Sequence, residues 1–300
     1  MACHHHHHAP PAATHRAFAI AIGVNLLFVM AEVFFALRAN STSLLADAGH
    51  NLTDVLGLVL AWIANWLQHL PASERYSYGY KRISIIAALI NGLVLISAAA
   101  GIAIAAVYQF MHPRPITELT IIIVAGIGIV INGGTALLFM RDQAHDLNIK
   151  GAFLHLLYDA LISLGIVITA CIISVTQWQW LDPLLSLVIV GFIVMGTWQM
   201  LADAINLLLD GVPRQVSINA VSEFLGQIPG VENVHDLHIW AYSTRDIALT
   251  AHLIMPSQRL SDAQLAKLRA DILHQFNINH VTIQVESGTD PQDCAQHDCC

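Results

Sequence analysis

Charged residues are scarce in this sequence, at 11% of 300 residues. Soluble domains contain about a quarter charged residues. By contrast, 56% of this chain is hydrophobic, which is typical of a protein that lies in a lipid bilayer. Lysine and arginine together number only 13, too few for a basic patch that binds nucleic acid. The composition therefore predicts an integral membrane protein and excludes a nucleic-acid partner.

Cysteine is almost absent between the two ends of the chain. Cys171 alone lies in an apolar run, where it is typical of a small core residue. Cysteines confined to the ends do not suit a framework of disulfides, although thiolates are good ligands for soft metals. We expect a flexible tail over residues 1–16, whose histidine run fits either a native segment or an affinity tag. A second, cysteine-containing tail is expected over residues 289–300.

Several enzyme motifs are also missing. The sequence holds no His-Glu-x-x-His, no serine–histidine nucleophile arrangement and no phosphate-binding loop. We therefore do not expect an enzyme.

Six apolar stretches are long enough to cross a bilayer as helices, which takes about 20 residues each. An even number of spans places both termini on one side of the membrane. That side carries most of the lysines and arginines near the span ends, whereas the other side carries only Arg38 and Arg114, so the positive-inside rule puts the termini in the cytoplasm. The expected spans lie near residues 17–37, 44–68, 83–110, 117–139, 148–175 and 183–203.

From about residue 211 the pattern becomes that of a small soluble domain. Residues 217–228 and 261–276 have the apolar spacing of amphipathic helices, and Ser261 is a suitable N-cap for the second. Three segments alternate and are rich in β-forming residues. They are residues 231–243, 246–255 and 280–286. The order αββαβ suits a ferredoxin-like α+β domain.

These patterns together predict the fold class and the domain boundaries. We expect a membrane all-α bundle of six transmembrane helices over residues 17–210. A small C-terminal α+β ferredoxin-like domain is expected in the cytoplasm over residues 211–288.

Two motifs place ionisable residues inside the expected spans. "HNLTD" at 50–54 and "HLLYD" at 155–159 each set a histidine four residues before an aspartate, on one face of a helix. Because a lipid-facing charge costs several kcal/mol, such residues indicate a functional site. One pair alone is also explained by a hydrogen bond that joins neighbouring helices, but two identical pairs favour a shared site.

The two pairs have the chemistry of a transition-metal site. Facing one another, they would supply two imidazole nitrogens and two carboxylate oxygens, a tetrahedral set that suits Zn²⁺, and Co²⁺ or Cd²⁺ nearly as well. Mg²⁺ and Ca²⁺ prefer all-oxygen sites with more ligands. Two aspartates would also cancel the charge of a divalent ion. The predicted ligands are His50, Asp54, His155 and Asp159, with Asp47 on the same stripe in a supporting role.

A series of motifs in order carries a resemblance to a known family. They are "SLLADAGHNLTD", "YGYKR", "NIKGAFLHLLYD", "LDPLLSL", "LLLDGVP" and "VHDLHIWA". From about residue 17 to 287 the chain resembles the cation diffusion facilitators, specifically the zinc-transporter branch. The resemblance implies a homodimeric exporter that moves zinc out of the cytoplasm in exchange for protons, through a transport site at the two His–Asp pairs.

The resemblance also implies a metal site in the cytoplasmic domain, at positions that map onto His235, His252 and Glu286. Zinc bound there would be a regulatory ligand. Strand alternation puts His235 on the face opposite His238, so a bend before Leu237 is needed if His235 is to reach a metal. Ordinary polar residues on a small domain are the alternative interpretation.

Residues at the chain ends match further ligands of some family members. A C-terminal site would use Cys294 with Cys299 or Cys300. An N-terminal site would use Cys3 with His4.

Other functions stay compatible with the sequence. One is an exporter of another divalent ion, such as Co²⁺, Cd²⁺ or Fe²⁺, and another is a metal-sensing membrane scaffold that transports nothing. Because no organelle signal is evident, a bacterial inner or plasma membrane is the expected location.

Overall fold

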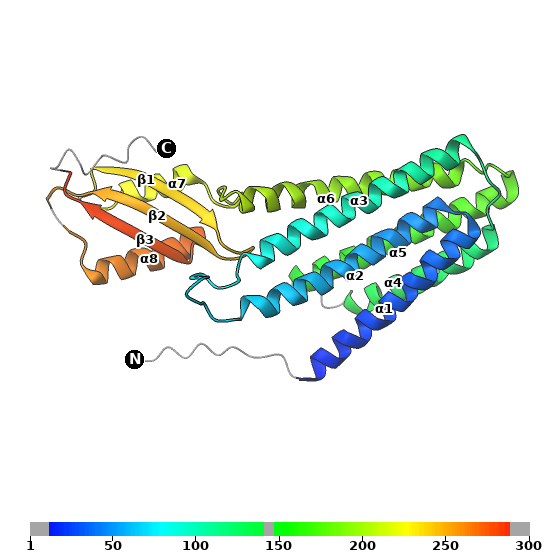
Figure 1. Ribbon diagram of the computed structural model, residues 1–300, viewed down its shortest axis with the longest axis horizontal. Helices are drawn as coiled ribbons and strands as arrows, with labels where there is room; N and C mark the ends of the chain where they lie inside the picture. The colour runs from blue at the N-terminus through cyan, green and yellow to red at the C-terminus, as the bar shows by residue number, and fades with distance from the viewer. Residues whose placement is uncertain (1–11, 141–146, 258, 289–300) are drawn as a thin grey trace. The chain divides into compact units, whose positions relative to one another are not determined.

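The computed structural model describes residues 12–140, 147–257 and 259–288. The described chain begins with six long helices (Figure 1). All six expected helices are confirmed as helices. The first starts at Ala12, earlier than expected, because alanine is the strongest helix former. The sixth runs on to Leu208 and stops before Gly211 and Pro213, which do not continue a helix. The helices are α1 (Ala12–Ala39), α2 (Thr42–Gln68), α3 (Ile83–Met111), α4 (Glu118–Phe139), α5 (Leu147–Thr176) and α6 (Leu181–Leu208).

The chain divides into two compact units. The first contains residues up to Val59 together with Leu93–Thr197, and the second contains Leu60–Gly92 together with residues from Trp198 onward. Helices α2, α3 and α6 therefore contribute to both units. The expected boundary at residue 211 stays a prediction.

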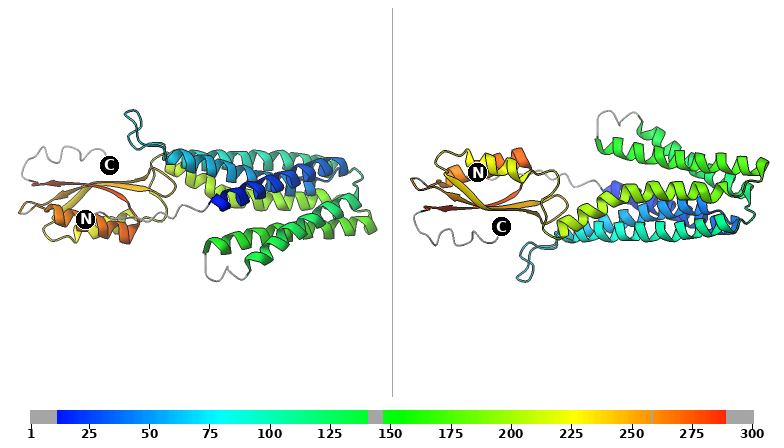
Figure 2. Two further views of the ribbon diagram at one scale, coloured as in Figure 1. Left: turned by 90° about the horizontal axis from the view of Figure 1, so that it is seen from below. Right: turned by 90° about the horizontal axis from the view of Figure 1, so that it is seen from above.

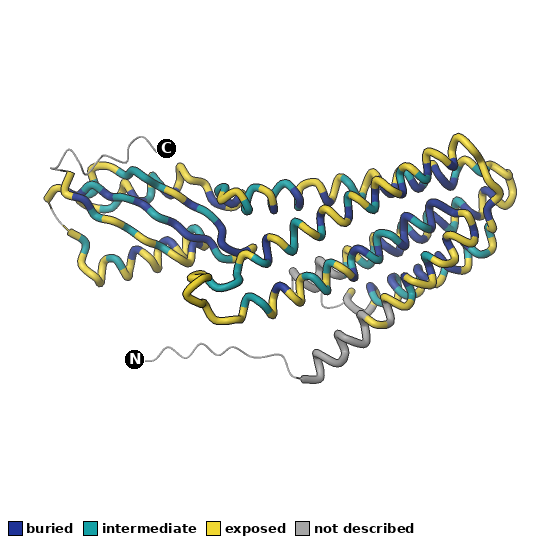
Figure 3. The backbone as a smooth tube through the Cα atoms, viewed as in Figure 1, coloured by how far each residue is buried: buried dark blue, intermediate teal, exposed yellow. Residues whose placement is uncertain are grey.

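Within the first unit, each helix buries one stripe and exposes another (Figure 3). The buried stripes meet in a core that includes Leu44, Ile121 and Ile166. Large apolar side chains cover the outside instead of polar ones, and Val175 is 85% exposed. Apolar surface on this scale is not stable in water and marks a surface that contacts lipid or a partner.

Four of the described helices are long and apolar enough to cross a bilayer. These spans are Ile83–Met111, Glu118–Leu137, Phe153–Thr176 and Leu181–Leu208. Of these, α4 and α5 pack along one another as an antiparallel pair (Figure 2). Helix α5 carries the second His–Asp pair, so this packing sets the position of half of the predicted site.

Asp182 ties the turn between α1 and α2 to the start of α6. Because Asp182 precedes Pro183, the sequence predicts the start of a helix here. The structure confirms this start, since Asp182 lies in the first turn of α6, and its buried carboxylate also caps α2. Asp182 accepts hydrogen bonds from the Thr42 backbone N–H at 2.7 Å and from the Ser41 hydroxyl at 2.6 Å. The orphan N–H groups at the start of α2 are thus satisfied by another helix.

The second unit contains a three-stranded sheet with two helices on one of its faces (Figure 2). Strand β2 is central, antiparallel to β1 and parallel to β3. Ser261 forms the predicted N-cap, within a capping box that includes Gln264. The α+β domain and its αββαβ order are confirmed. The elements are α7 (Ile218–Gly226), β1 (Asn233–Ala241), β2 (Ile247–Ile254), α8 (Asp262–Phe276) and β3 (His280–Glu286).

Alternation along the central strand separates a core face from an open face. Leu249, Ala251 and Leu253 are buried in the core beneath α7 and α8. Thr250 and His252, between them, point to the other face. Polar side chains on β2 are therefore collected on the face that no described helix of this domain covers.

The α2–α3 connection contacts the sheet within the second unit. Lys81 pairs with Asp246 at 3.2 Å, and the ring of Tyr78 lies 5.2 Å from that of Tyr242. Arg82 pairs with Asp210. Both basic side chains therefore have partners in their own chain.

Candidate functional site

Four side chains from α2 and α5 form a closed ring of histidine–aspartate contacts. The Nε2 atom of His50 lies 3.7 Å from Asp54 and 3.6 Å from Asp159. The Nε2 atom of His155 lies 3.3 Å from Asp54 and 3.5 Å from Asp159. Each histidine therefore faces the aspartate of its own helix and that of the other helix. These four residues are called the His–Asp ring below.

The spacing of the His–Asp ring is that of metal ligands. Zinc binds nitrogen and oxygen at about 2.0–2.2 Å, so two ligands of a tetrahedral site lie about 3.4 Å apart. The four contacts of the ring, 3.3 to 3.7 Å, fall around that value. Asp54 Oδ2 and Asp159 Oδ1 are buried, and among the described residues neither accepts a hydrogen bond of normal geometry. His50, His155 and Asp159 can each offer one atom to a common metal ion, and Asp54 Oδ2 lies 3.7 and 3.3 Å from the nitrogens of the two histidines.

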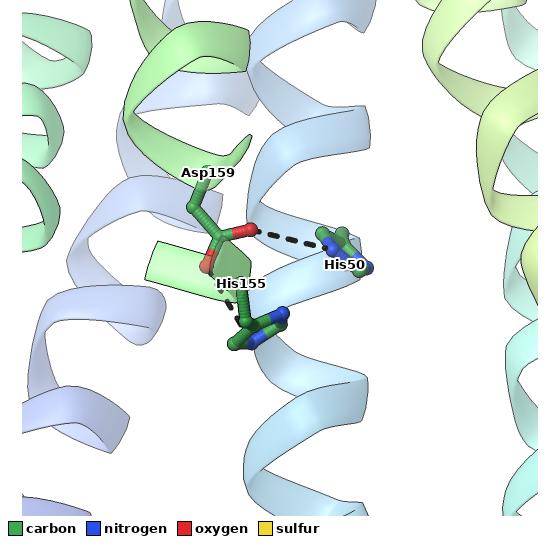
Figure 4. Close-up of side chains that lie close together, drawn as sticks. All are labelled: His50, His155 and Asp159. Atoms are coloured by element: carbon green, nitrogen blue, oxygen red, sulfur yellow. Dashed lines mark ion pairs between the residues drawn. The ribbon is translucent and has the colours of Figure 1, made fainter. Parts of the chain in front are cut away.

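The ring is open on one side and closed on the other. The His155 side chain is 49% exposed and that of Asp54 is 29% exposed, whereas that of Asp159 is only 5% exposed. Figure 4 shows the Asp159 carboxylate between His50 and His155, with one oxygen directed at each. His155 is therefore the most exposed member of the ring and Asp159 the most buried.

Beyond the ring, the polar stripe of α2 continues into buried hydrogen bonds. Asp47 accepts a hydrogen bond from the Ser163 hydroxyl of α5 at 2.9 Å. Asn51 donates to Glu32 of α1 at 3.2 Å. These bonds fix the rotation of α2 against both neighbours, which aims His50 at α5. The sequence predicted a supporting role for Asp47. The contact between Glu32 and Asn51 joins two helices and could not be inferred from the sequence.

A second group of metal-binding side chains lies on the open face of the sheet. Glu286 contacts His235 Nε2 at 3.0 Å through one oxygen and His252 Nδ1 at 2.8 Å through the other. Gln284 donates a further hydrogen bond to Glu286 at 2.9 Å. His235, His252 and Glu286 are called the sheet cluster below. Each can offer one atom to a common metal ion.

A β-bulge brings His235 into this cluster. The register between β1 and β2 shifts between His235 and His238, and Asp236 adopts a left-handed backbone with φ of 50°. The extra residue turns His235 to the open face, directly opposite His252. The bend that the sequence required before Leu237 is therefore present.

The bulge also adds two residues that the sequence did not predict as site members. Asp236 contacts His252 Nε2 at 3.4 Å and His238 Nε2 at 2.9 Å. Asp236 therefore holds the far nitrogen of His252, as carboxylates commonly do for metal-binding histidines. An aspartate beside a histidine in a strand was the only sequence signal for it.

The predicted terminal ligands lie outside the described residues. They are Cys3, His4, Cys294, Cys299 and Cys300.

Comparison with known proteins identifies the origin of both regions. A family model described as the cation efflux transmembrane domain matches residues 18–209. A second, described as the cation efflux protein cytoplasmic domain, matches residues 213–288. The chain belongs to the cation efflux family.

Named members of the cation efflux family are similar to this chain over most of their length. The metal cation efflux system protein CzcD of Cupriavidus metallidurans is 34% identical over 94% of this chain and 90% of its own. The cadmium, cobalt and zinc/H(+)-K(+) antiporter of Bacillus subtilis is 33% identical over 89% and 88%. The zinc transporter ZitB of Escherichia coli is 32% identical over 93% and 88%.

Membership of the cation efflux family confirms the resemblance found in the sequence. Together with the apolar helices it makes this an integral membrane protein with a small α+β domain. Its named relatives are transporters, in line with the absence of enzyme motifs.

Proposed function

We propose that this protein exports zinc from the cytoplasm in exchange for protons, and that both bind at the His–Asp ring. The ligand-like spacing of the ring carries this proposal. Two imidazoles and two carboxylates suit zinc in type and number, and their combined charge balances a divalent ion within the membrane. The names of relatives that carry zinc support the same cargo.

Competition for the same atoms couples zinc to protons. Imidazole and carboxylate bind a metal only when they are deprotonated, so each zinc ion that enters the ring displaces the protons held there. Histidine suits this role because its ordinary pKa of about 6.5 lies near working pH. When the site opens to the other side of the membrane, arriving protons displace the ion.

The proposed topology has six spans with both termini in the cytoplasm. Helices α1 and α2 complete the count, although they are less apolar than the other four. The stripe of Asp47, His50, Asn51 and Asp54 accounts for the lower hydropathy of α2, because those residues face other helices and the ring. The basic residues of the sequence support the orientation, and the bacterial relatives support an inner or plasma membrane.

The cytoplasmic domain is proposed to bring two subunits together and to sense zinc. Its αββαβ order supports a ferredoxin-like fold. In the sheet cluster, three ligands leave a fourth position for water or a further ligand. Further ligands are proposed at the chain ends, because these residues match ligands of some family members. They are Cys3 with His4, and Cys294 with Cys299 or Cys300.

The test is zinc flux in proteoliposomes under an imposed pH gradient, comparing the wild type with Asp54→Ala and Asp159→Ala. We expect gradient-driven flux in the wild type and none in either variant. Zinc flux that does not depend on the pH gradient would indicate a channel instead of an exchanger. Flux of cadmium or cobalt in preference to zinc would favour the second candidate, an exporter of another divalent ion. A wild type that binds zinc and moves no metal would be a scaffold.

A further inference from the structure

Two carboxyl groups outside the His–Asp ring are buried deep in the first unit. Glu32 on α1 is 0% exposed and Asp47 on α2 is 1% exposed. Neither belongs to the ring, and the transport mechanism proposed above assigns them no step. Ionised carboxylates are rarely buried this completely unless a positive group is paired with them.

Only two of the four carboxyl oxygens of Glu32 and Asp47 accept a hydrogen bond from another side chain. Asn51 donates to Glu32 Oε2, and Ser163 donates to Asp47 Oδ2. Glu32 Oε1 and Asp47 Oδ1 are also fully buried, and no donor among the described residues reaches either atom. The titratable groups around the pair are Asp159 on α5 and His50 on α2.

The two carboxyl groups are neighbours, because Asn51, which donates to Glu32, lies one helical turn after Asp47 on the same stripe of α2. A carboxylate has no hydrogen to donate, so a hydrogen bond between the two groups exists only when one of them carries a proton. Two ionised carboxylates in one buried region would repel one another strongly in a medium of low dielectric constant. Pairs of facing acids elsewhere respond by sharing a single proton.

We propose that Glu32 and Asp47 form a proton-binding site, separate from the metal ligands, whose shared proton leaves when zinc enters the His–Asp ring. This inference rests on the proposed exchange of zinc for protons. The step forms the bonds of zinc to the ring and breaks one O–H bond of the pair. The proton passes to water on the side to which the ring is open, and two carboxylates remain.

Charge balance gives the reason for the coupling. A zinc ion brings two positive charges beside Asp159 and His50, the two groups that also face the acidic pair. The part of that charge not balanced by protons leaving the ring favours ionisation of the pair. By linkage, a proton on the pair weakens zinc binding by the same factor. A proton bound at the pair would therefore help to expel the ion on the release side.

The test counts protons released per zinc ion bound, by titrating the purified full chain with zinc in weakly buffered detergent solution. Glu32→Gln replaces the protonated acid with an amide of the same shape, and we expect about one proton fewer per zinc ion than in the wild type. Asp47→Asn should show the same deficit. Glu118→Gln, the same change on the half-exposed first turn of α4, is the matched control and should release the wild-type number.

The outcomes separate this inference from the proposed function. If the wild type releases no protons on binding zinc, proton exchange itself is wrong. If the wild type releases protons and both variants release the same number, only the Glu32–Asp47 site is wrong. Infrared spectra of the wild type decide the matter even where a variant fails to fold. The carbonyl band of a protonated carboxyl group must be present without zinc and must weaken with zinc, and a band unchanged by zinc overturns the proposal.

Discussion

The two groups of metal-binding side chains differ in how their atoms are held before any ion arrives. In the His–Asp ring, on two helices, contacts of 3.3 to 3.7 Å are too long or too poorly aligned for strong hydrogen bonds. In the sheet cluster, Glu286 forms a hydrogen bond with His235 Nε2 at 3.0 Å and lies 2.8 Å from His252 Nδ1. The ring is spaced for an ion, whereas the cluster is already drawn together around Glu286.

This difference fits the two tasks proposed for them. A transport site must take up and release its ion in every cycle, so nothing in the protein should compete strongly with the ion. A metal at the sheet cluster must compete with the short contacts of Glu286 to both histidines, of which the one to His235 is a hydrogen bond. This competition fits the proposed sensing of zinc. Asp236 on the bulge contacts His252 and further restrains its imidazole. The predictions below test whether the two groups are as different as their geometry indicates.

The largest effect is expected from removing one charge from each group in turn. Asp159→Asn should reduce zinc flux by more than about 100-fold, because loss of even a supporting residue costs 10–100-fold at a metal site. Glu286→Gln should leave at least about a third of the flux, because Glu286 lies outside the proposed transport site. Proteoliposome flux measures both. Asp203→Asn on α6, paired with Arg214, is the control and should transport normally. Equal losses in the first two variants would erase the distinction.

A slightly smaller effect is expected on equilibrium binding at the sheet cluster. Glu286→Gln should weaken zinc binding there by about 10–100-fold, because the group that joins both histidines loses its charge. Calorimetric titration of a protein that also carries Asp159→Asn isolates this event from the ring. His274→Gln, on the exposed side of α8, should bind as the parent does. An unchanged affinity in Glu286→Gln would leave the sheet cluster as a hydrogen-bonded structure only.

Ligand type in the ring should control which metal is carried. His50→Asp replaces a nitrogen ligand with oxygen and adds a negative charge, so preference should move toward Mn²⁺. We expect the ratio of zinc to manganese transport to fall about tenfold, in competition assays with both ions present. His69→Asp, in the turn just after α2, should keep the wild-type ratio. An unchanged ratio in His50→Asp would mean that other residues determine the metal selectivity.

The smallest effect concerns a carboxylate in neither group. Burial by itself would raise the pKa of Asp246, but hydrogen bonds from Ser243, Lys81 and Asn279 and the charge of Lys81 lower it overall. A lowered pKa stabilises the fold above the unfolded value near 3.9, and the stability is lost as pH falls through the folded value. Asp246→Asn should therefore lower the melting temperature at pH 7 by about 2–4 °C.

That difference should shrink in acid, and the comparison of the two proteins at several pH values is the measurement. Below the lowered pKa of Asp246 the wild-type carboxyl is neutral too, and the two melting temperatures should converge. A gap that stays constant down to pH 3 would assign the effect to packing instead of charge.

Much of this protein was determined by the sequence alone, because its patterns have long periods and strong contrasts. Six apolar stretches became six helices, and the αββαβ domain appeared in the expected order. The two His–Asp pairs could be predicted as one site because i and i+4 residues share a helix face and charge is costly in lipid. The need for a bend beside His235 also followed from strand alternation.

Only the tertiary structure decided which polar groups meet across helices. Glu32 lies 19 residues from Asn51, and Asp182 lies 140 residues from Thr42, so no local pattern links them. The left-handed Asp236 and the bulge that turns His235 depend on pairing with β2. Local periodicity determines which side of a helix or strand is polar. The rotation and register of the neighbouring elements determine which group each polar side chain contacts.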